Sequence, residues 1–292
     1  AGYQEAALNR AKVIFSALPG NNPEVARQLP YSGGMRLGFY LVANGTTDGV
    51  IQGGNNPGEV YFSIPQANAA GIKPLQVSET NGQFTLAWED TPNLGNSDFN
   101  DLLMTFEIQQ QNLTLQQAIA NFQGDKEAEL FDLRLLAGRE VQTEFPIVNS
   151  EASYNNVFGL YRVENKEGTV IDPISGESFN PGDTGYTAAA IRLSQSAQKG
   201  VSLNRNNQGL ATTLEGGFLY APFLIADSTP DTVLDGNPLN DPSVYFSFIG
   251  ANSDGVDHVR LLGDNTIGFE DLANGGDRDY NDSVFQVNFS FV

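Results

Sequence analysis

The feature that most constrains the fold is an internal repeat. The segment EVYFSI at 59–64 returns as SVYFSF at 243–248, and NSDFNDLLMTFEI at 96–108 returns as DRDYNDSVFQVNF at 277–289. The length of 292 residues fits one large domain or two ordinary ones. A unit that occurs twice therefore predicts two similar domains in tandem.

The extent of the matching segments predicts the domain boundaries. We expect repeat one at 1–110, a polar linker with a short helix at 111–127, and repeat two at 128–292. The front of repeat two, at 128–184, has no counterpart before Gly2, so repeat one lacks its front half. Three explanations stay open: a fragment of a longer array, a processed precursor, or strands supplied by another molecule.

Short segments rich in aromatic and β-branched residues alternate with clusters of Gly, Asn, Asp and Pro, as is typical of antiparallel sheets. In FQVNFSFV at 285–292, every second residue is apolar, which predicts a strand with one buried face. Helical spacing is clear only at 5–18 and weaker at 188–198. The sequence thus predicts a mainly β fold of two tandem antiparallel β-sandwich (jelly-roll-like) domains, each with a short helix.

The charge of the chain limits its partners. Thirty-five Asp and Glu face fifteen Lys and Arg, a formal charge of -20, which repels nucleic acids and anionic lipid surfaces. No apolar run approaches the roughly 20 residues of a membrane span, and the first residues lack signal-peptide features, so we expect any export signal to have been removed. With no Cys, a metal site must use oxygen ligands.

The loop DRDYND crowds oxygen-bearing side chains just before the last strand: Asp277, Asp279, Asn281 and Asp282. Such a cluster is unfavourable unless a cation neutralises it. Ca²⁺ accepts about six to eight oxygen ligands in a tolerant geometry, so this loop predicts a calcium site. The spacing is not that of an EF-hand, which needs Gly and Glu where this loop has Asp282 and Asn288.

Repeat one carries the same loop as NSDFND, with Asp98, Asn100 and Asp101 at the matching positions. Asn96 stands where repeat two has Asp277, so this site has one formal charge fewer and the lower predicted affinity. The alternative is that these residues are turn formers, which hydrogen-bond their own backbone. Repetition of the loop in a diverged context favours the metal.

Two acidic pairs upstream of the loops are further ligand candidates. Glu270-Asp271 follows a predicted strand in repeat two, and Glu89-Asp90 follows its counterpart in repeat one. Each pair reaches the acidic loop if that strand folds back beside it.

These loops, together with SYNNVFGLYRV at 153–163 and GYTAAAI at 185–191, resemble a domain-of-unknown-function family with a D-x-D-Y-N-D loop. That family recurs in secreted proteins of cyanobacteria and other bacteria, often beside calcium-binding nonapeptide repeats. The resemblance implies extracellular or cell-surface, calcium-associated β domains, with no established activity. It places the motif on the loop residues of both repeats, although Asn96, Ser97 and Phe99 depart from it.

We expect no enzymatic activity, because the only histidine, His258, lacks a recognisable partner motif for a Ser or Thr nucleophile. Paired carboxylates could hydrolyse glycosides, but duplication of one acidic loop favours binding or structure. The preferred function is a calcium-binding structural module of a surface layer, matrix or filament, self-associating by strand complementation. The alternative is a calcium-dependent adhesin that recognises glycans beside Tyr280 or Phe99.

Overall fold

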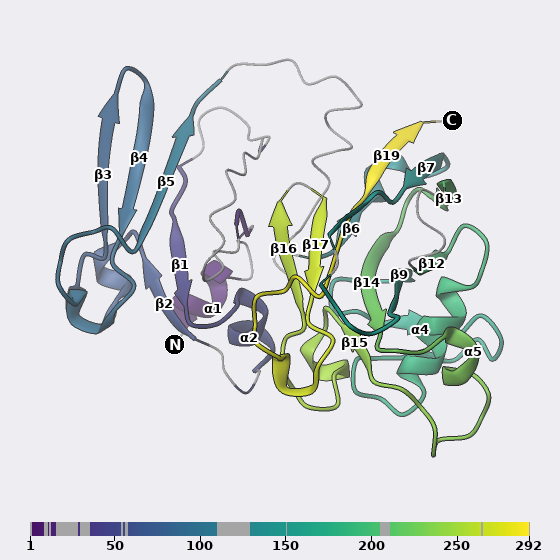
Figure 1. Cartoon of the computed structure of the whole chain (residues 1–292). Coiled ribbons are helices and arrows are strands. Elements are labelled where there is room, and N and C mark those ends of the chain that lie inside the picture. The colour runs from purple at the N-terminus through teal and green to yellow at the C-terminus, as the bar shows by residue number, and fades with distance from the viewer. Residues whose placement is uncertain are drawn as a thin grey trace.

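The computed structural model describes residues 2–8, 11, 13–15, 29, 36–53, 55, 58–109, 129–149, 151–204, 211–263 and 265–291. The linker predicted at 111–127, with its helix, lies outside these residues. Within the described residues, no helix has the length and apolar composition needed to cross a bilayer. The chain is mainly β, with antiparallel sheets and a few short helices, as the sequence predicted (Figure 1).

The described residues of repeat one form two small antiparallel sheets, β1-β2 and β3-β4-β5. Its elements are α1 (Gly2–Leu8), β1 (Tyr40–Ala43), α2 (Thr47–Gln52), β2 (Glu59–Phe62), η1 (Pro65–Ala67), η2 (Ala69–Gly71), β3 (Leu75–Thr80), β4 (Gln83–Trp88), η3 (Pro92–Leu94) and β5 (Leu102–Glu107). Trp88 and Leu86 of β4 are buried between these sheets with Tyr61 of β2. Repeat one therefore has a small core of its own.

The helix predicted at 5–18 is wrong in its extent. The observed helix α1 ends at Leu8, and residues 13–15 are not helical. Of the described residues with helical spacing, Ile14 and Phe15 are only half-buried, and Val13 packs against the core of repeat two. Contacts with a neighbouring core thus replace the helix that the spacing alone favoured.

Repeat two is larger and more deeply packed. Its elements are β6 (Phe131–Asp132), η4 (Arg134–Leu136), β7 (Glu140–Glu144), β8 (Ile147–Asn149), β9 (Val157–Val163), β10 (Val170–Ile171), β11 (Ser178–Phe179), α4 (Tyr186–Ser194), β12 (Gly200–Asn204), β13 (Ala211–Glu215), β14 (Leu219–Ile225), α5 (Pro230–Val233), β15 (Val244–Phe246), η6 (Ile249–Ala251), β16 (Val259–Gly263), β17 (Thr266–Phe269), η7 (Ala273–Gly275), β18 (Ser283–Gln286) and β19 (Asn288–Phe291). The main sheets have the orders β12-β9-β14-β15, β13-β7-β19 and β16-β17-β18-β8.

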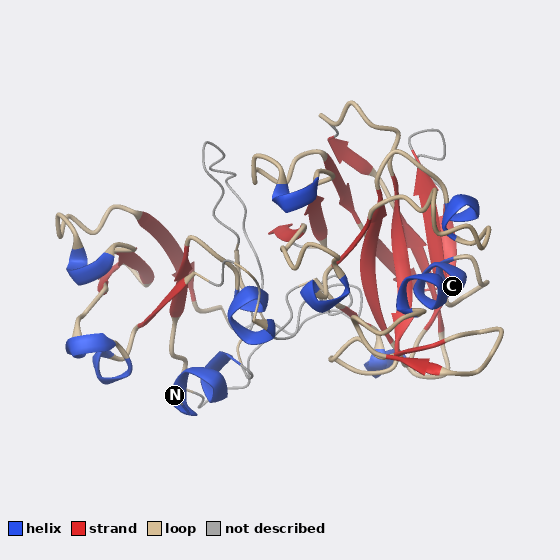
Figure 2. Ribbon diagram, turned by 90° about the horizontal axis from the view of Figure 1, so that it is seen from below, coloured by secondary structure: helices blue, strands red, loops and turns tan. Residues whose placement is uncertain are grey.

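The central strands β9 and β14 are buried on both faces. One face shares a core with β16, β17 and β18, where Phe158 stacks on Phe285 with ring centroids 4.8 Å apart. The other face packs against α4, whose Tyr186 contacts Tyr161. The sheets curl around these cores as a half-barrel (Figures 1 and 2).

The predicted alternation in the last strand is confirmed: Phe285 and Val287 are fully buried, and Phe289 is 9% exposed. The segment nevertheless forms two strands in different sheets. β18 pairs with β17 and β8, whereas β19 pairs with β7. The change occurs at Val287, whose N–H donates to the carbonyl oxygen of Asn265 (2.8 Å). This end of the chain therefore joins two sheets around one core.

Candidate metal centre

The acidic loop of repeat two connects two neighbouring strands. β17 and β18 are antiparallel, and Phe269 at the end of β17 faces Ser283 at the start of β18. The residues leaving β17 therefore lie beside those entering β18, which brings Glu270 next to the loop. Within the loop Asn274, Gly276, Arg278 and Tyr280 have positive φ, so the backbone curls tightly.

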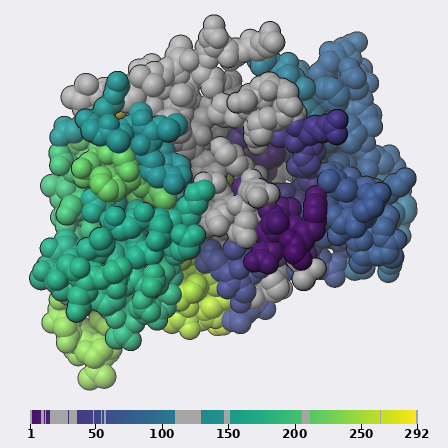
Figure 3. Space-filling view, turned by 180° about the vertical axis from the view of Figure 1, so that it is seen from behind, coloured from purple at the N-terminus to yellow at the C-terminus, as the bar shows by residue number. Residues whose placement is uncertain are grey.

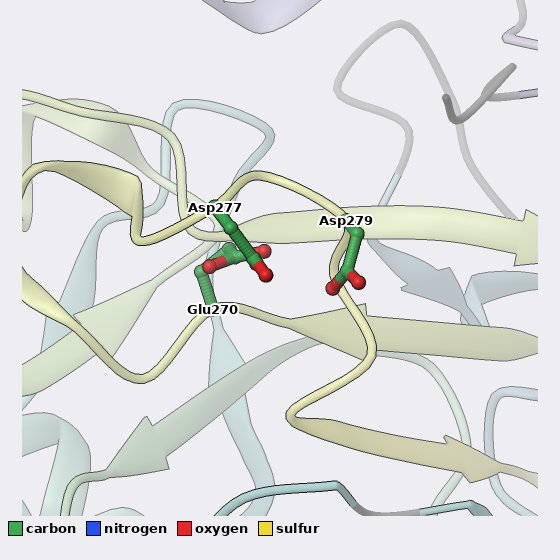
Figure 4. A group of neighbouring side chains, drawn as sticks. All are labelled: Glu270, Asp277 and Asp279. Carbon is green, nitrogen blue, oxygen red and sulfur yellow. The ribbon is translucent and has the colours of Figure 1, made fainter. Parts of the chain in front are cut away.

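Glu270 is the buried member of the site. Its side chain is fully buried, and its Oε1 accepts the N–H of Tyr280 at 2.7 Å. Its Oε2 has no hydrogen-bond partner among the described residues. One carboxylate oxygen each from Glu270, Asp277 and Asp279 lie within 4.8 Å of one another (Figure 4). Figure 4 shows all three carboxylates on one side of the loop.

The approach of the loop to Glu270 depends on a glycine. Gly276 has φ 44° and ψ -130°, a conformation open essentially to glycine alone. A Cβ at this position would lie 2.3 Å from Oε2 of Glu270. The loop therefore folds directly over the unpartnered oxygen.

Full ionisation of this acidic group is unfavourable without a cation. Burial raises the pKa of Glu270 to about 7; the backbone N–H groups of Tyr280 and Arg278 oppose this shift, and the charges of Asp282 and Asp277 reinforce it. Burial also raises the pKa of Asp279, and the pKa of Asp282 to about 6. A divalent cation would remove this penalty. Glu270, Asp277 and Asp279 thus form an acidic group that could hold a metal ion.

The other predicted ligands of repeat two lie around this group and brace it. Asn281 donates from Nδ2 to Oδ2 of Asp279 (2.7 Å). Asp282 accepts the N–H of Asp271 through Oδ2 (2.9 Å), which ties the end of the loop to its start. Asp271 in turn accepts from Nδ2 of the buried Asn156 (2.7 Å). The sequence predicted these side chains as metal ligands. In the structure they form the hydrogen bonds that hold the loop in shape.

Repeat one reproduces the loop. Positive φ recurs at Asn93, Gly95, Ser97 and Phe99. Three equivalent hydrogen bonds recur too: from the N–H of Phe99 to Oε1 of Glu89 (2.6 Å), from the N–H of Asp90 to Oδ2 of Asp101 (2.9 Å), and from Asn100 Nδ2 to Asp98 Oδ2 (2.8 Å). Like Glu270, Glu89 is fully buried, and its Oε2 has no partner among the described residues. The two loops therefore share a backbone conformation, a hydrogen-bond pattern and a buried glutamate.

The difference between the loops lies at Asn96. Its Nδ2 donates to Oδ2 of Asp98 (2.8 Å), where repeat two has a third carboxylate. In the part of the chain that the structure describes, the three-carboxylate group is found in repeat two alone. The expectation of a weaker site in repeat one follows from this substitution and stays a prediction.

Sequence reasoning missed the residues behind the loop. Asp254 accepts the N–H of Asn274 through Oδ2 (2.8 Å) and faces Nε2 of His258 (2.9 Å). His258 is fully buried, stacks on Tyr245, and faces the carbonyl oxygen of Glu270 through Nδ1 (3.0 Å). Burial opposes ionisation of Asp254, but the donors from Asn274 and His258 lower its pKa. The lone histidine next to Asp257 in the sequence was the available signal.

The fold and the site define a β-rich protein with two copies of one acidic-loop unit. The chain matches a domain-of-unknown-function family, DUF4114, at residues 32–109 and again at 214–290. These matches cover more than half of the chain, which therefore belongs to the DUF4114 family, in two tandem copies. The second match begins at Leu214, so the front of repeat two, including the segments at 153–163 and 185–191 that contributed to the resemblance, lies outside it. Comparison with curated proteins and with solved structures finds no match.

Proposed function

We propose that the chain is a non-enzymatic calcium-binding structural module of an extracellular or cell-surface assembly. The observation that carries this proposal is the buried carboxylate of Glu270, which forms a group with Asp277 and Asp279 and whose Oε2 has no hydrogen-bond partner among the described residues. An uncompensated polar oxygen in the interior costs about 1–3 kcal/mol, and more when charged. A bound cation would account for its retention.

Calcium fits the donors better than magnesium does. All the candidate ligands are hard oxygens, and Asp277 is exposed, so water can complete the shell. Ca²⁺ tolerates irregular sets of about six to eight oxygens, whereas Mg²⁺ requires near-octahedral geometry and retains several waters. A cation here would join the end of β17 to the loop before β18 and so stiffen the sheet.

Calorimetry tests the assignment. Wild-type protein is expected to bind calcium in both repeats, more tightly in repeat two. Asp279→Ala should remove the repeat-two site and loosen the loop before Phe285, and the matched variant Asp98→Ala should remove only the repeat-one site. Two undiminished sites in Asp279→Ala would reject the assignment. Binding only to the folded state adds about 2.7 kcal/mol at a hundredfold excess over Kd, so chelation should also lower the Tm.

Self-association is the second part of the proposal, and two exposed apolar side chains, Val77 in β3 and Ile108 just after β5, support it. Val77 pairs with Leu86 in repeat one, and Leu261 pairs with Ile267 at the equivalent place in repeat two. Val77 is 58% exposed, whereas Leu261 is fully buried. Ile108 is 78% exposed, but its counterpart Phe289 is 9% exposed in β19, beside β7.

We expect a strand from a second copy to cover these exposed side chains by strand complementation. Sedimentation at high protein concentration with calcium should show polymers, and Val77→Glu should shift them toward monomers. Ser78→Glu, one residue along on the opposite face of the same strand, is the matched control and should leave assembly intact. Monomeric wild-type protein under these conditions would contradict the expectation.

The alternative, a calcium-dependent adhesin for glycans, required an exposed aromatic residue beside the metal. Tyr280 is 3% exposed and its hydroxyl contacts Arg260, so it offers no stacking surface in repeat two. Phe99 in repeat one is half-buried. These positions favour the structural function over glycan recognition.

A further inference from the structure

The two repeats contact each other at the turn that carries Asp254. Asn55, just after α2, donates from its backbone N–H to the carbonyl oxygen of Gly255 (3.2 Å) and from Nδ2 to that of Asp254 (2.8 Å). Gln52, the last residue of α2, accepts the N–H of Ile249 through Oε1 (2.9 Å). On the face in Figure 3, the region of repeat one near residue 50 adjoins the yellow-green part of repeat two. We call these contacts the inter-repeat contact.

The local sequence of both partners is suited to this contact. Thr46 caps α2 by accepting the N–H of Gly49 (2.7 Å), and Gly53 ends it in the left-handed conformation, which directs the chain toward the turn. On the other side, Gly255 has φ 64°, and a Cβ there would lie 3.2 Å from Nδ2 of Asn55. A glycine thus leaves room for the Asn55 amide.

The turn that receives Asn55 also holds the metal loop. Asp254 contacts both repeats. Its backbone carbonyl oxygen accepts from Asn55 in repeat one, and its carboxylate accepts from the N–H of Asn274 in η7 of repeat two. The Asp254 carboxylate also contacts Nε2 of His258. His258 contacts Glu270 twice: its Nδ1 lies 3.0 Å from the Glu270 carbonyl oxygen, and its own carbonyl oxygen accepts the Glu270 N–H (3.0 Å). The connection therefore reaches the buried ligand.

A second connection runs through Tyr280. Its hydroxyl contacts Nη2 of Arg260 (3.1 Å), and the guanidinium carbon lies 4.4 Å from the ring centroid. Nη1 of Arg260 reaches the carbonyl oxygen of Gly45 in repeat one (3.5 Å). Because the N–H of Tyr280 donates to Glu270, movement of the loop also moves the Tyr280 side chain and its contact with Arg260.

In the described residues of repeat one these connections are absent, although the same loop is present. Pairing of β3 with β4 and of β16 with β17 makes Gln76 the counterpart of Arg260 and Pro74 that of His258. Phe99, without a hydroxyl, replaces Tyr280. Since the loop forms in repeat one without these groups, the loop itself does not require them. Their presence in repeat two points to the inter-repeat contact.

We propose that cation binding in the repeat-two loop and docking of repeat one on the Asp254 turn are coupled. The inference rests on the proposed function, because it needs a cation at Glu270. A cation would hold residues 274–280 in one conformation, and their contacts would in turn hold the side chains of Asp254 and Arg260 in place. Because Asp254 and Arg260 contact repeat one, its orientation would then be defined. By linkage, docking strengthens cation binding by the same factor.

Distances between spin labels test the coupling, and the chain has no Cys to interfere. Labels go on Ser78→Cys in repeat one and Leu239→Cys in repeat two, both at exposed positions. The distance distribution is expected to be narrow with calcium and broad with a chelator. Glu270→Gln should keep it broad in both conditions, while circular dichroism reports an intact fold.

The reciprocal test uses Asn55→Ala, a change at an exposed residue outside the metal group. This variant should lower the calcium affinity of the repeat-two site about fivefold or more. Asn240→Ala, in an exposed loop of repeat two, is the control and should leave affinity unchanged. If wild-type protein binds no calcium, the proposed function fails. If it binds calcium but neither the distances nor the affinity of Asn55→Ala change, the coupling is overturned and the metal site stands.

Discussion

Gly276→Ala is expected to abolish calcium binding in repeat two and to destabilise the folded protein. The new Cβ would lie 2.3 Å from Oε2 of Glu270, so either the carboxylate or the loop must move. The backbone adds its own penalty, because φ 44° with ψ -130° is strained for alanine by about 1–3 kcal/mol. Calorimetry should show one remaining site, and urea unfolding should show the loss of stability.

Gly236→Ala separates the two effects in that prediction. Gly236 also has a positive φ, 78°, but a Cβ there meets no atom within 4 Å. This control should lose some stability through backbone strain and keep both calcium sites. Unchanged calcium binding in Gly276→Ala would show that the loop does not close over Glu270 as the structure places it.

Much of the fold could be predicted from local pattern. Alternation at Phe285, Val287 and Phe289 identified a half-buried strand because side chains in a strand point to opposite faces in turn. Alternation did not show that Val287 marks a change of sheet, since that depends on which distant strands, β7 and β8, come to lie alongside. The helix predicted at 5–18 failed for the same reason: tertiary contacts of Val13 outweighed spacing.

The sequence predicted which residues cluster at the candidate site, but not which of them form the three-carboxylate group and which brace the loop. The sequence gathered Asp277, Asp279, Asn281 and Asp282 without distinguishing those that face a common point from those that brace the loop. That distinction depends on the loop conformation, including positive φ at Arg278 and Tyr280, which the residue spacing does not specify. Glu270 was identified only on the condition that its strand folds back, and the pairing of β17 with β18 meets this condition.

The residues behind the loop could not be predicted, because their roles depend on contacts between segments far apart in the sequence. Asn55 and Asp254 are joined only when the repeats come together. Asn156 reaches Asp271 only because β9 starts beside the loop. Repetition can reveal a duplicated site, but groups present in one copy alone, such as Arg260, give no such signal.

The stability of calcium-free protein is expected to fall as pH rises from about 4 to about 7. Folding raises the pKa of Glu270 from 4.5 to about 7, and that of Asp282 from 3.8 to about 6. Between these values the folded state binds more protons than the unfolded state, so the free energy of unfolding decreases with rising pH. Glu270 alone accounts for a loss on the order of 3 kcal/mol, since one pKa unit corresponds to about 1.4 kcal/mol.

Calcium should reverse this trend, because a cation favours the ionised carboxylates and releases their protons on binding. Calcium affinity should therefore rise with pH up to about 7, and the stability gained from calcium should be greater at pH 8 than at pH 5. Urea unfolding at both pH values, with and without calcium, measures the difference. In Glu270→Gln, which cannot ionise, the pH dependence of the calcium-free protein should be clearly reduced. An equal slope in that variant would mean that other groups cause the pH dependence and that Glu270 is not held in its protonated form.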